Sequence, residues 1–258
     1  MSKVAVEGDE GFVLHGYPYM ETSLIVEAFT RRHGRVACVA KGARRPKSNL
    51  RGTLQAFQPL ALAWFGKSEL KTLKTAEPSR IGPQLTGQAL LSGFYVNELL
   101  LKLSHRDDAH ESLYEAYEEA IHKLQTLSLP GAMSGDAGTP LSPARLIAPV
   151  LRQFERRLLA ELGYGLMLEE DSRHQAIVPG QRYAYVLEHG PMPVAATRAG
   201  QGAALELQGK SLLDIARDDY RDPVSAAEAK QLMRHVLNHH LNGAELHTRQ
   251  LIRELQQT

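Results

Sequence analysis

The chain has 258 residues, enough for two modest domains or one large one, each with its own buried core. Its 43% hydrophobic and 23% charged residues argue against a disordered chain. The net charge of +1 would by itself argue against a polyanion partner, but there is no Asp or Glu between Ala28 and Ser68, where nine residues are basic.

The N-terminal part of the sequence predicts β-strands, because β-branched and aromatic residues lie between turn formers. His33-Gly34 fits a tight hairpin turn, and Tyr17-Pro18-Tyr19 is predicted to form another. The predicted strands cover residues 11–16, 23–30, 35–41, 55–65 and 70–75. Five short strands in about 70 residues predict a small closed barrel of the OB type.

After Pro78 the apolar spacing becomes helical. Helices are predicted near residues 90–102, 112–127, 143–163, 223–242 and 245–256, with starts at Ser142-Pro143 and Asp222-Pro223. A flexible loop is predicted at about 128–142 and a small irregular or β lobe at about 169–204. The predicted fold class is α+β, with a five-stranded barrel domain over residues 1–80 and a mainly α-helical domain over 81–258.

The basic segment from Lys41 to Arg51 is the main candidate site. Gly42 and Pro46 predict a loop, and no acidic residue cancels the field of its cations. Guanidinium groups bind phosphate through two parallel hydrogen bonds, and lysine acts as a point charge. The alternative is a solvated loop that only improves solubility. The cations of this segment are Lys41, Arg44, Arg45, Lys47 and Arg51.

Aromatic side chains could add stacking platforms for bases. Alternate residues of a strand must point inward, so we expect Phe29 and Trp64 in the barrel core. Tyr17 and Tyr19, beside a proline, are the better candidates for base stacking. With few exposed aromatics, contacts to the backbone of a nucleic acid would dominate over base readout.

Three arginines share the helix predicted near residue 154: Arg152, Arg156 and Arg157. A basic rim beside apolar side chains such as Phe154 could bind an acidic, apolar-tipped peptide, or DNA. The charged outer face of a packed helix explains the same pattern at least as well.

The sequence contains no complete catalytic motif. Gly66-Lys67-Ser68 and Gly209-Lys210-Ser211 resemble the end of a P-loop, but the required earlier glycines are replaced by Ala61 and Ala204. His235 and His239 are one helical turn apart but lack a third metal ligand. We therefore predict no enzymatic chemistry, no cofactor and no metal.

The single cysteine, Cys38, excludes an intramolecular disulfide and a zinc site built from several thiolates. It lies in a strand pattern and is most simply a core residue. The start of the chain lacks a signal pattern, and the apolar runs are too short to cross a bilayer. We expect a cytoplasmic protein without membrane contact.

Several runs of the sequence together resemble one family. These runs are FVLHGYPYMETSL from residue 12, FTRRHGRV from 29, VAKGARRP from 39, FYVNELL from 94 and FERRLLAELGYG from 154. They resemble the RecO family of bacterial DNA repair proteins, and the resemblance covers nearly the whole chain. Many family members place two CxxC pairs after the Gly-Tyr-Gly segment to hold zinc; residues 169–190 contain no cysteine here.

The resemblance implies an OB-fold domain followed by a helical domain, and a protein that acts at the nucleoid. It also implies binding of single- and double-stranded DNA, annealing of complementary strands without ATP, and help in loading RecA. The implied partners are RecR and the C-terminal tail of single-strand-binding protein. A pure protein-protein adaptor is the alternative function. By position, the implied DNA contacts are Arg31, Arg32 and Arg35 together with Lys41, Arg44 and Arg45.

Overall fold

The computed structural model of the chain describes residues 5–130, 142–194 and 205–255, with side chains up to Leu251. The chain divides into two compact units: residues 1–143 with 246–258 form the first, and residues 144–245 form the second. The barrel ends near residue 80, where the sequence predicts a domain boundary, yet three helices complete the same unit. Most of the predicted loop at 128–142, and residues 195–204 of the predicted lobe, fall outside the described residues.

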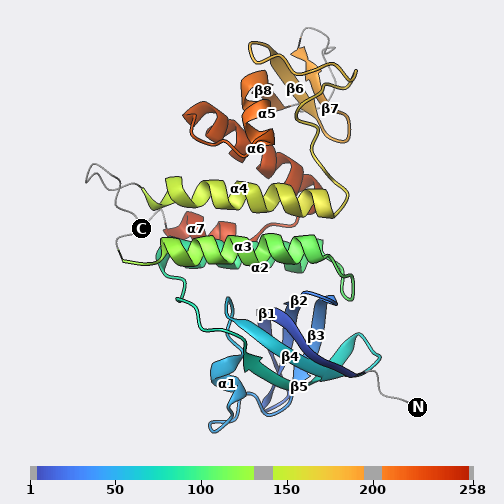
Figure 1. Cartoon of the computed structure of the whole chain (residues 1–258), viewed down its shortest axis with the longest axis vertical. Coiled ribbons are helices and arrows are strands. Elements are labelled where there is room, and N and C mark those ends of the chain that lie inside the picture. Colours follow the sequence, from blue (N-terminus) through green and yellow to red (C-terminus); the bar gives the residue numbers. More distant parts are fainter. Residues whose placement is uncertain (1–4, 131–141, 195–204, 256–258) are drawn as a thin grey trace. The chain divides into compact units, whose positions relative to one another are not determined.

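A closed five-stranded barrel with the strand order β1-β2-β3-β5-β4 opens the first unit (Figure 1). Its strands are β1 (Ala5–Tyr19), β2 (Ser23–Thr30), β3 (Gly34–Ala40), β4 (Pro59–Phe65) and β5 (Leu70–Pro78). All neighbouring strands are antiparallel except β3 and β5, which pair in parallel. A five-stranded, Greek-key barrel of this kind is OB-like. With the helices that follow, it confirms the predicted α+β class.

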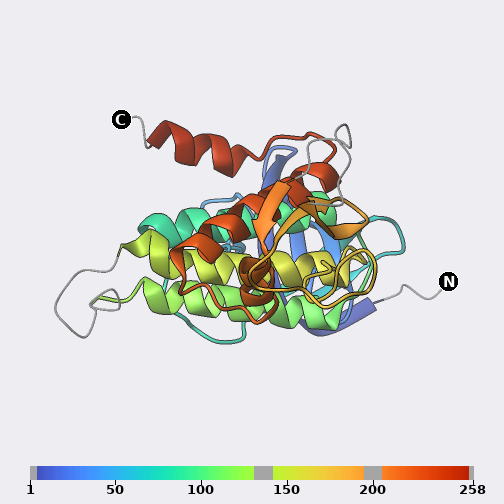
Figure 2. The ribbon, with the colours of Figure 1, turned by 90° about the horizontal axis from the view of Figure 1, so that it is seen from above.

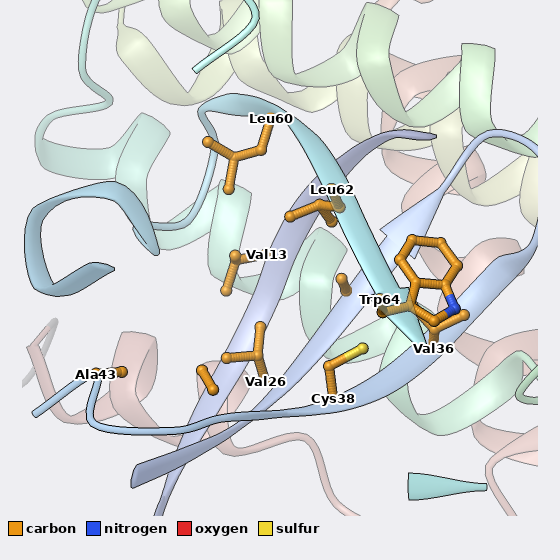
Figure 3. Packing of buried hydrophobic residues seen from close by; sticks show 10 residues of the cluster. Val13, Val26, Val36, Cys38, Ala43, Leu60, Leu62 and Trp64 are labelled. Carbon is orange, nitrogen blue, oxygen red and sulfur yellow. The ribbon is translucent and has the colours of Figure 1, made fainter. Parts of the chain in front are cut away.

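Inward-facing side chains of β1, β2, β3 and β4 fill the barrel (Figure 3), and the partly buried Leu73 and Ala76 of β5 pack against them. Trp64 and Cys38 are each 2% exposed, which confirms both as core residues. Burial raises the pKa of the Cys38 thiol to about 12, so the thiol stays protonated at neutral pH. The other large or branched members of this cluster are Val13, Val26, Val36, Leu60 and Leu62.

Several predicted strand boundaries are wrong: β1 begins at Ala5 and not at residue 11, and β5 ends at Pro78 and not at residue 75. β1 continues through the predicted Tyr17-Pro18-Tyr19 turn, and the chain reverses instead at Met20, whose φ is 50°. β4 pairs with β1 only as far as Phe12. After Phe12, β1 is therefore an edge strand, where proline is tolerated although it has no N–H to donate. The strand predicted at 55–65 begins only at Pro59, after a short helix, α1 (Leu50–Thr53).

Two antiparallel helices, α2 (Gly87–Leu103) and α3 (Glu111–Leu127), run side by side against the barrel (Figures 1 and 2). Tyr114 and Tyr117 of α3 pack on Phe12 and Phe29 of the barrel, with ring centroids 5.1 to 5.9 Å apart. Burial of these rings provides a large apolar contact between the two layers. Phe29 is therefore a core residue, as predicted.

A buried polar contact fixes α2 on the barrel. The strand register of β1 shifts between Val13 and His15, and the carbonyl of Leu14 at this irregularity accepts a hydrogen bond from Nδ2 of Asn97. Oδ1 of the same amide accepts the hydroxyl of Tyr117, at 2.8 Å. Because Asn97 is 2% exposed, these bonds specify one seating of the helices on the barrel.

The C-terminal helix α7 (His247–Leu255) packs on α2 of the first unit. The N–H groups of His247 and Thr248 donate to the carboxylate of Glu98 on α2, at 2.8 and 3.0 Å. Burial acts to raise the pKa of Glu98, but these bonds and that from the Thr248 hydroxyl outweigh it and lower the pKa. A side chain distant in sequence thus caps the start of this helix.

The second unit combines helices with a small sheet of order β7-β6-β8. The helix start predicted at Asp222-Pro223 is confirmed, and the Asp222 side chain caps the helix by accepting the N–H of Val224 at 2.8 Å. Helix α5 was not predicted, and the sheet consists of two strands within the predicted irregular or β lobe and a third just after it. The elements are α4 (Pro143–Glu161), β6 (Arg182–Val186), β7 (Gly190–Pro193), β8 (Leu205–Gln208), α5 (Gly209–Ala216) and α6 (Pro223–His240).

A buried aspartate organises the chain before this sheet, where many relatives were expected to use zinc. Asp171 is 2% exposed, and its Oδ1 accepts the N–H groups of Arg173 and Gln175 at 2.8 and 3.0 Å. Its own N–H donates to the carbonyl of Gln175. Hydrogen bonds within one turn thus hold this segment of the lobe.

We expect Asp171→Ala to destabilise the second unit by about 1–3 kcal/mol, because two backbone donors lose their acceptor. Asp171→Asn keeps an oxygen at that position and should cost less than about 1 kcal/mol. Urea unfolding, with amide exchange read at Arg173 and Gln175, measures both. Equal losses in the two variants would show that the negative charge, and not the acceptor geometry, matters.

Candidate nucleic-acid interface

The cation loop, residues 41–51, is anchored to the barrel. Ala43 in its middle is fully buried and belongs to the barrel core (Figure 3), and Leu50 packs against the same cluster. Gly42 has φ +69°, a conformation that favours glycine. Successive turns follow, with Arg45 N–H donating to the carbonyl of Gly42 at 3.1 Å and Ser48 N–H to that of Arg45 at 3.0 Å.

The anchoring turns the charged side chains outward. All five cations of the loop are exposed. The guanidinium of Arg44 donates to the main-chain carbonyls of Met20 and Glu21, at 3.5 and 3.4 Å. In the described part of the chain none of the five forms an ion pair with a carboxylate. Their positive field is therefore available to a polyanion. The five are Lys41, Arg44, Arg45, Lys47 and Arg51.

Arg31, which the resemblance assigns to DNA, lies instead among carboxylates. Its guanidinium is 3.3 to 3.4 Å from four glutamates and stands 4.7 Å from the ring centre of Tyr114. Three of these glutamates belong to α3, so the side chain joins the barrel to this helix. The glutamates are Glu10, Glu111, Glu115 and Glu118.

Arg32 and Arg35 also have internal partners. Nε of Arg32 donates to Asp9, which is 1% exposed, at 3.1 Å. Arg35 lies 3.3 Å from the buried carboxylate of Glu27 and donates to the carbonyl of Ser104 at 2.9 Å. The predicted DNA contacts therefore fall into two groups. The cations of the loop are exposed, whereas Arg31, Arg32 and Arg35 are paired with carboxylates.

The turn between β1 and β2 lies beside the cation loop, because Arg44 N–H donates to the carbonyl of Thr22 at 2.8 Å. Between them lies a hollow of 380 Å³ whose lining includes Tyr19, Lys41 and Arg45. Lys71 of β5 also lines it and forms an ion pair with Asp107 at 2.6 Å. The sequence did not single out Lys71, which follows Glu69 outside the acid-free run.

The two tyrosines proposed for base stacking differ in their surroundings. Tyr17 is 46% exposed, and its ring lies 4.4 Å from the imidazole of His15. Tyr19 is half-buried and lines the hollow together with two loop cations. Of the pair, only Tyr19 therefore lies where the exposed charge is concentrated.

The predicted arginines of α4 lie in the second unit. Arg152 is 2.5 Å from Glu155, a fully buried carboxylate. Arg156 makes two hydrogen bonds to Asp218, at 3.0 and 2.5 Å, and these raise its pKa. Arg157 is exposed. Arg152 and Arg156 are thus paired with carboxylates of the same unit.

Other candidate chemistry has structural explanations. Gly66 lies in the β4–β5 turn, as predicted, and Lys210 is held by Asp214 and Asp222 at 2.5 and 2.7 Å. His240 stacks on Tyr164 at 3.8 Å. Within the described residues there is no group of three or more potential metal ligands, and no helix there is long and apolar enough to span a membrane.

Comparison with known proteins gives consistent matches. Residues 1–81 match the family model described as Recombination protein O N terminal, and residues 141–250 match Recombination protein O C terminal. The chain is 48% identical over 258 residues to the DNA repair protein RecO of Nitrosospira multiformis, covering 100% of this chain and 99% of that one. The same-named protein of Thiobacillus denitrificans is 45% identical over 256 residues, 98% of this chain and 94% of the relative.

Proposed function

This chain belongs to the recombination protein O family of DNA repair and recombination proteins, and from that premise we propose that its cation loop binds single- and double-stranded DNA. The observation that supports the proposal is the contrast within the acid-free segment. Five cations of an anchored loop are exposed without carboxylate partners among the described residues, whereas Arg31, Arg32 and Arg35 are paired. The DNA contacts are therefore assigned to the loop and not to those three arginines.

The proposed activity is annealing of complementary strands without ATP. Two DNA strands repel each other, and cations that neutralise their phosphates raise the frequency of productive encounters. No covalent bond is broken or formed in this process, so it needs no nucleophile, metal or phosphate-binding loop. The protein acts as a mediator and not as an enzyme in this proposal.

Recombination also requires protein partners. We propose that the chain contacts the C-terminal tail of single-strand-binding protein and RecR, and through them promotes RecA loading at the nucleoid. In the second unit, we propose that the exposed side chain of Arg157 on α4 contacts an acidic peptide or DNA. Arg152 and Arg156 support α4 through Glu155 and Asp218.

A salt titration tests the electrostatic part of the proposal. If the loop neutralises about four or five phosphates of a single strand, the plot of log affinity against log salt should have a slope of about −3, at about 0.7 per phosphate. Fluorescence anisotropy of a labelled oligonucleotide measures it. A nearly flat plot, with tight binding of acidic peptides, would support the adaptor function instead.

A further inference from the structure

The hollow beside the cation loop has a size and position suited to a small ligand. Its volume of 380 Å³ is near the lower end of small-molecule pockets, about 300–1,000 Å³. It opens where the turn after β1, the end of β3 and the start of β5 meet. This volume can hold one nucleotide.

The lining of the hollow is apolar on several sides. Tyr19 comes from the end of β1, Met20 from the turn after it, Val39 from β3 and Leu70 from β5. Met20 is 75% exposed and is held at the turn by its positive φ of 50°. An aromatic ring with flexible and branched aliphatic neighbours can receive the flat face of a base.

Charge in the hollow is unevenly distributed. Lys71, whose side chain is 12% exposed, is neutralised by Asp107 through two contacts of 2.6 and 2.8 Å. Lys41 and Arg45 are exposed and have no carboxylate partner within the described residues. The buried part of the hollow is thus suited to a neutral group and its edge to anions.

We propose that the hollow takes one unpaired base of a DNA strand, stacked on Tyr19, while Lys41 and Arg45 bind the adjacent phosphates. This inference rests on the proposed function and adds a preference for unpaired DNA to it. A base within a duplex is stacked and paired, and it can enter only after it is flipped out. Phosphates of a duplex still reach the loop cations. The protein should therefore bind both forms but hold single strands by an additional contact.

The test compares Tyr19→Ala, Tyr19→Phe and Tyr17→Ala in the full-length protein. We expect Tyr19→Ala to weaken binding of a single-stranded oligonucleotide about tenfold or more, the effect of losing one stacked base. Affinity for duplex of the same length should change less than twofold. Tyr19→Phe keeps the ring and should bind as the unchanged protein does, as should Tyr17→Ala, the matched exposed tyrosine on the same strand.

A fluorescent base analogue supplies a second readout. An oligonucleotide containing 2-aminopurine should be quenched on binding to the unchanged protein and to Tyr19→Phe, but much less by Tyr19→Ala at saturation. The proposed base pocket would be overturned if Tyr19→Ala, with an unchanged melting temperature, lost equal affinity for single-stranded and duplex DNA. Unchanged quenching of 2-aminopurine by Tyr19→Ala would also overturn it. Absence of DNA binding by the unchanged protein would instead refute the proposed function itself.

Discussion

Replacement of Arg44, Arg45 and Lys47 together by alanine should weaken binding of single-stranded DNA about 100-fold at moderate salt. Each exposed cation contributes about 1 kcal/mol to a phosphate contact, and 1.4 kcal/mol corresponds to a tenfold change in affinity. The slope of log affinity against log salt should fall by about 2. Annealing of complementary oligonucleotides, followed by fluorescence energy transfer, should slow in parallel.

A matched variant distinguishes the effect of removing loop cations from the effect of lowering the net charge of the protein. Arg217, Lys230 and Arg234 of the second unit are exposed and have no ion-pair partner in the described residues. Their joint replacement by alanine removes the same net charge and should leave affinity within about threefold of the unchanged protein. Equal losses in both triple variants would assign DNA binding to general charge and remove the loop as the site.

Glu27→Ala should reduce the free energy of unfolding by about 3 kcal/mol, the lower end of the cost of breaking a buried ion pair, because it leaves two partly buried arginines without their carboxylate. The Glu27 carboxylate is 2% exposed and binds both Arg35 and Arg106. Arg35→Ala breaks the same network and the bond to the Ser104 carbonyl, so it should destabilise comparably. Urea unfolding at constant m-value measures both changes.

Glu10→Gln provides the surface comparison for this network. Glu10 is 55% exposed at 3.4 Å from Arg31, and its loss should cost less than about 1 kcal/mol. The folded fraction of Arg35→Ala should bind DNA nearly as the unchanged protein does. A fall in DNA affinity of Arg35→Ala as large as that of the loop variant, without loss of stability, would contradict the structural role assigned to Arg35.

Strand and helix periodicity predicted most of this fold because local patterns determine it. Alternating apolar residues identified the five barrel strands, and Asp222-Pro223 identified the start of α6. The end of β1 was mispredicted because Pro18 ordinarily marks a turn. Pro18 is tolerated inside the strand because the pairing of β1 with β4 ends at Phe12. That pairing joins residues far apart in the sequence, so no local pattern predicts it.

The site was predictable only in part for a similar reason. An acid-free run is visible in the sequence, but the carboxylates that pair with it lie elsewhere in the chain. Arg31 meets Glu118, which is 87 residues away, and Arg35 binds the carbonyl of Ser104, which is 69 residues away. Ala43 is buried in the barrel core, whereas the cations on both sides of it in the loop are exposed. Sequence spacing alone could not distinguish structural arginines from loop cations.

The return of α7 to α2 has a consequence for biosynthesis. A ribosome completes the barrel, α2 and α3 long before it reaches residue 246, yet the partners of the Glu98 carboxylate are His247 and Thr248. Domains generally fold as units while the chain emerges. Here the first unit gains α7 only after the entire second unit has been translated, so the Glu98 carboxylate on α2 lacks these backbone partners until then.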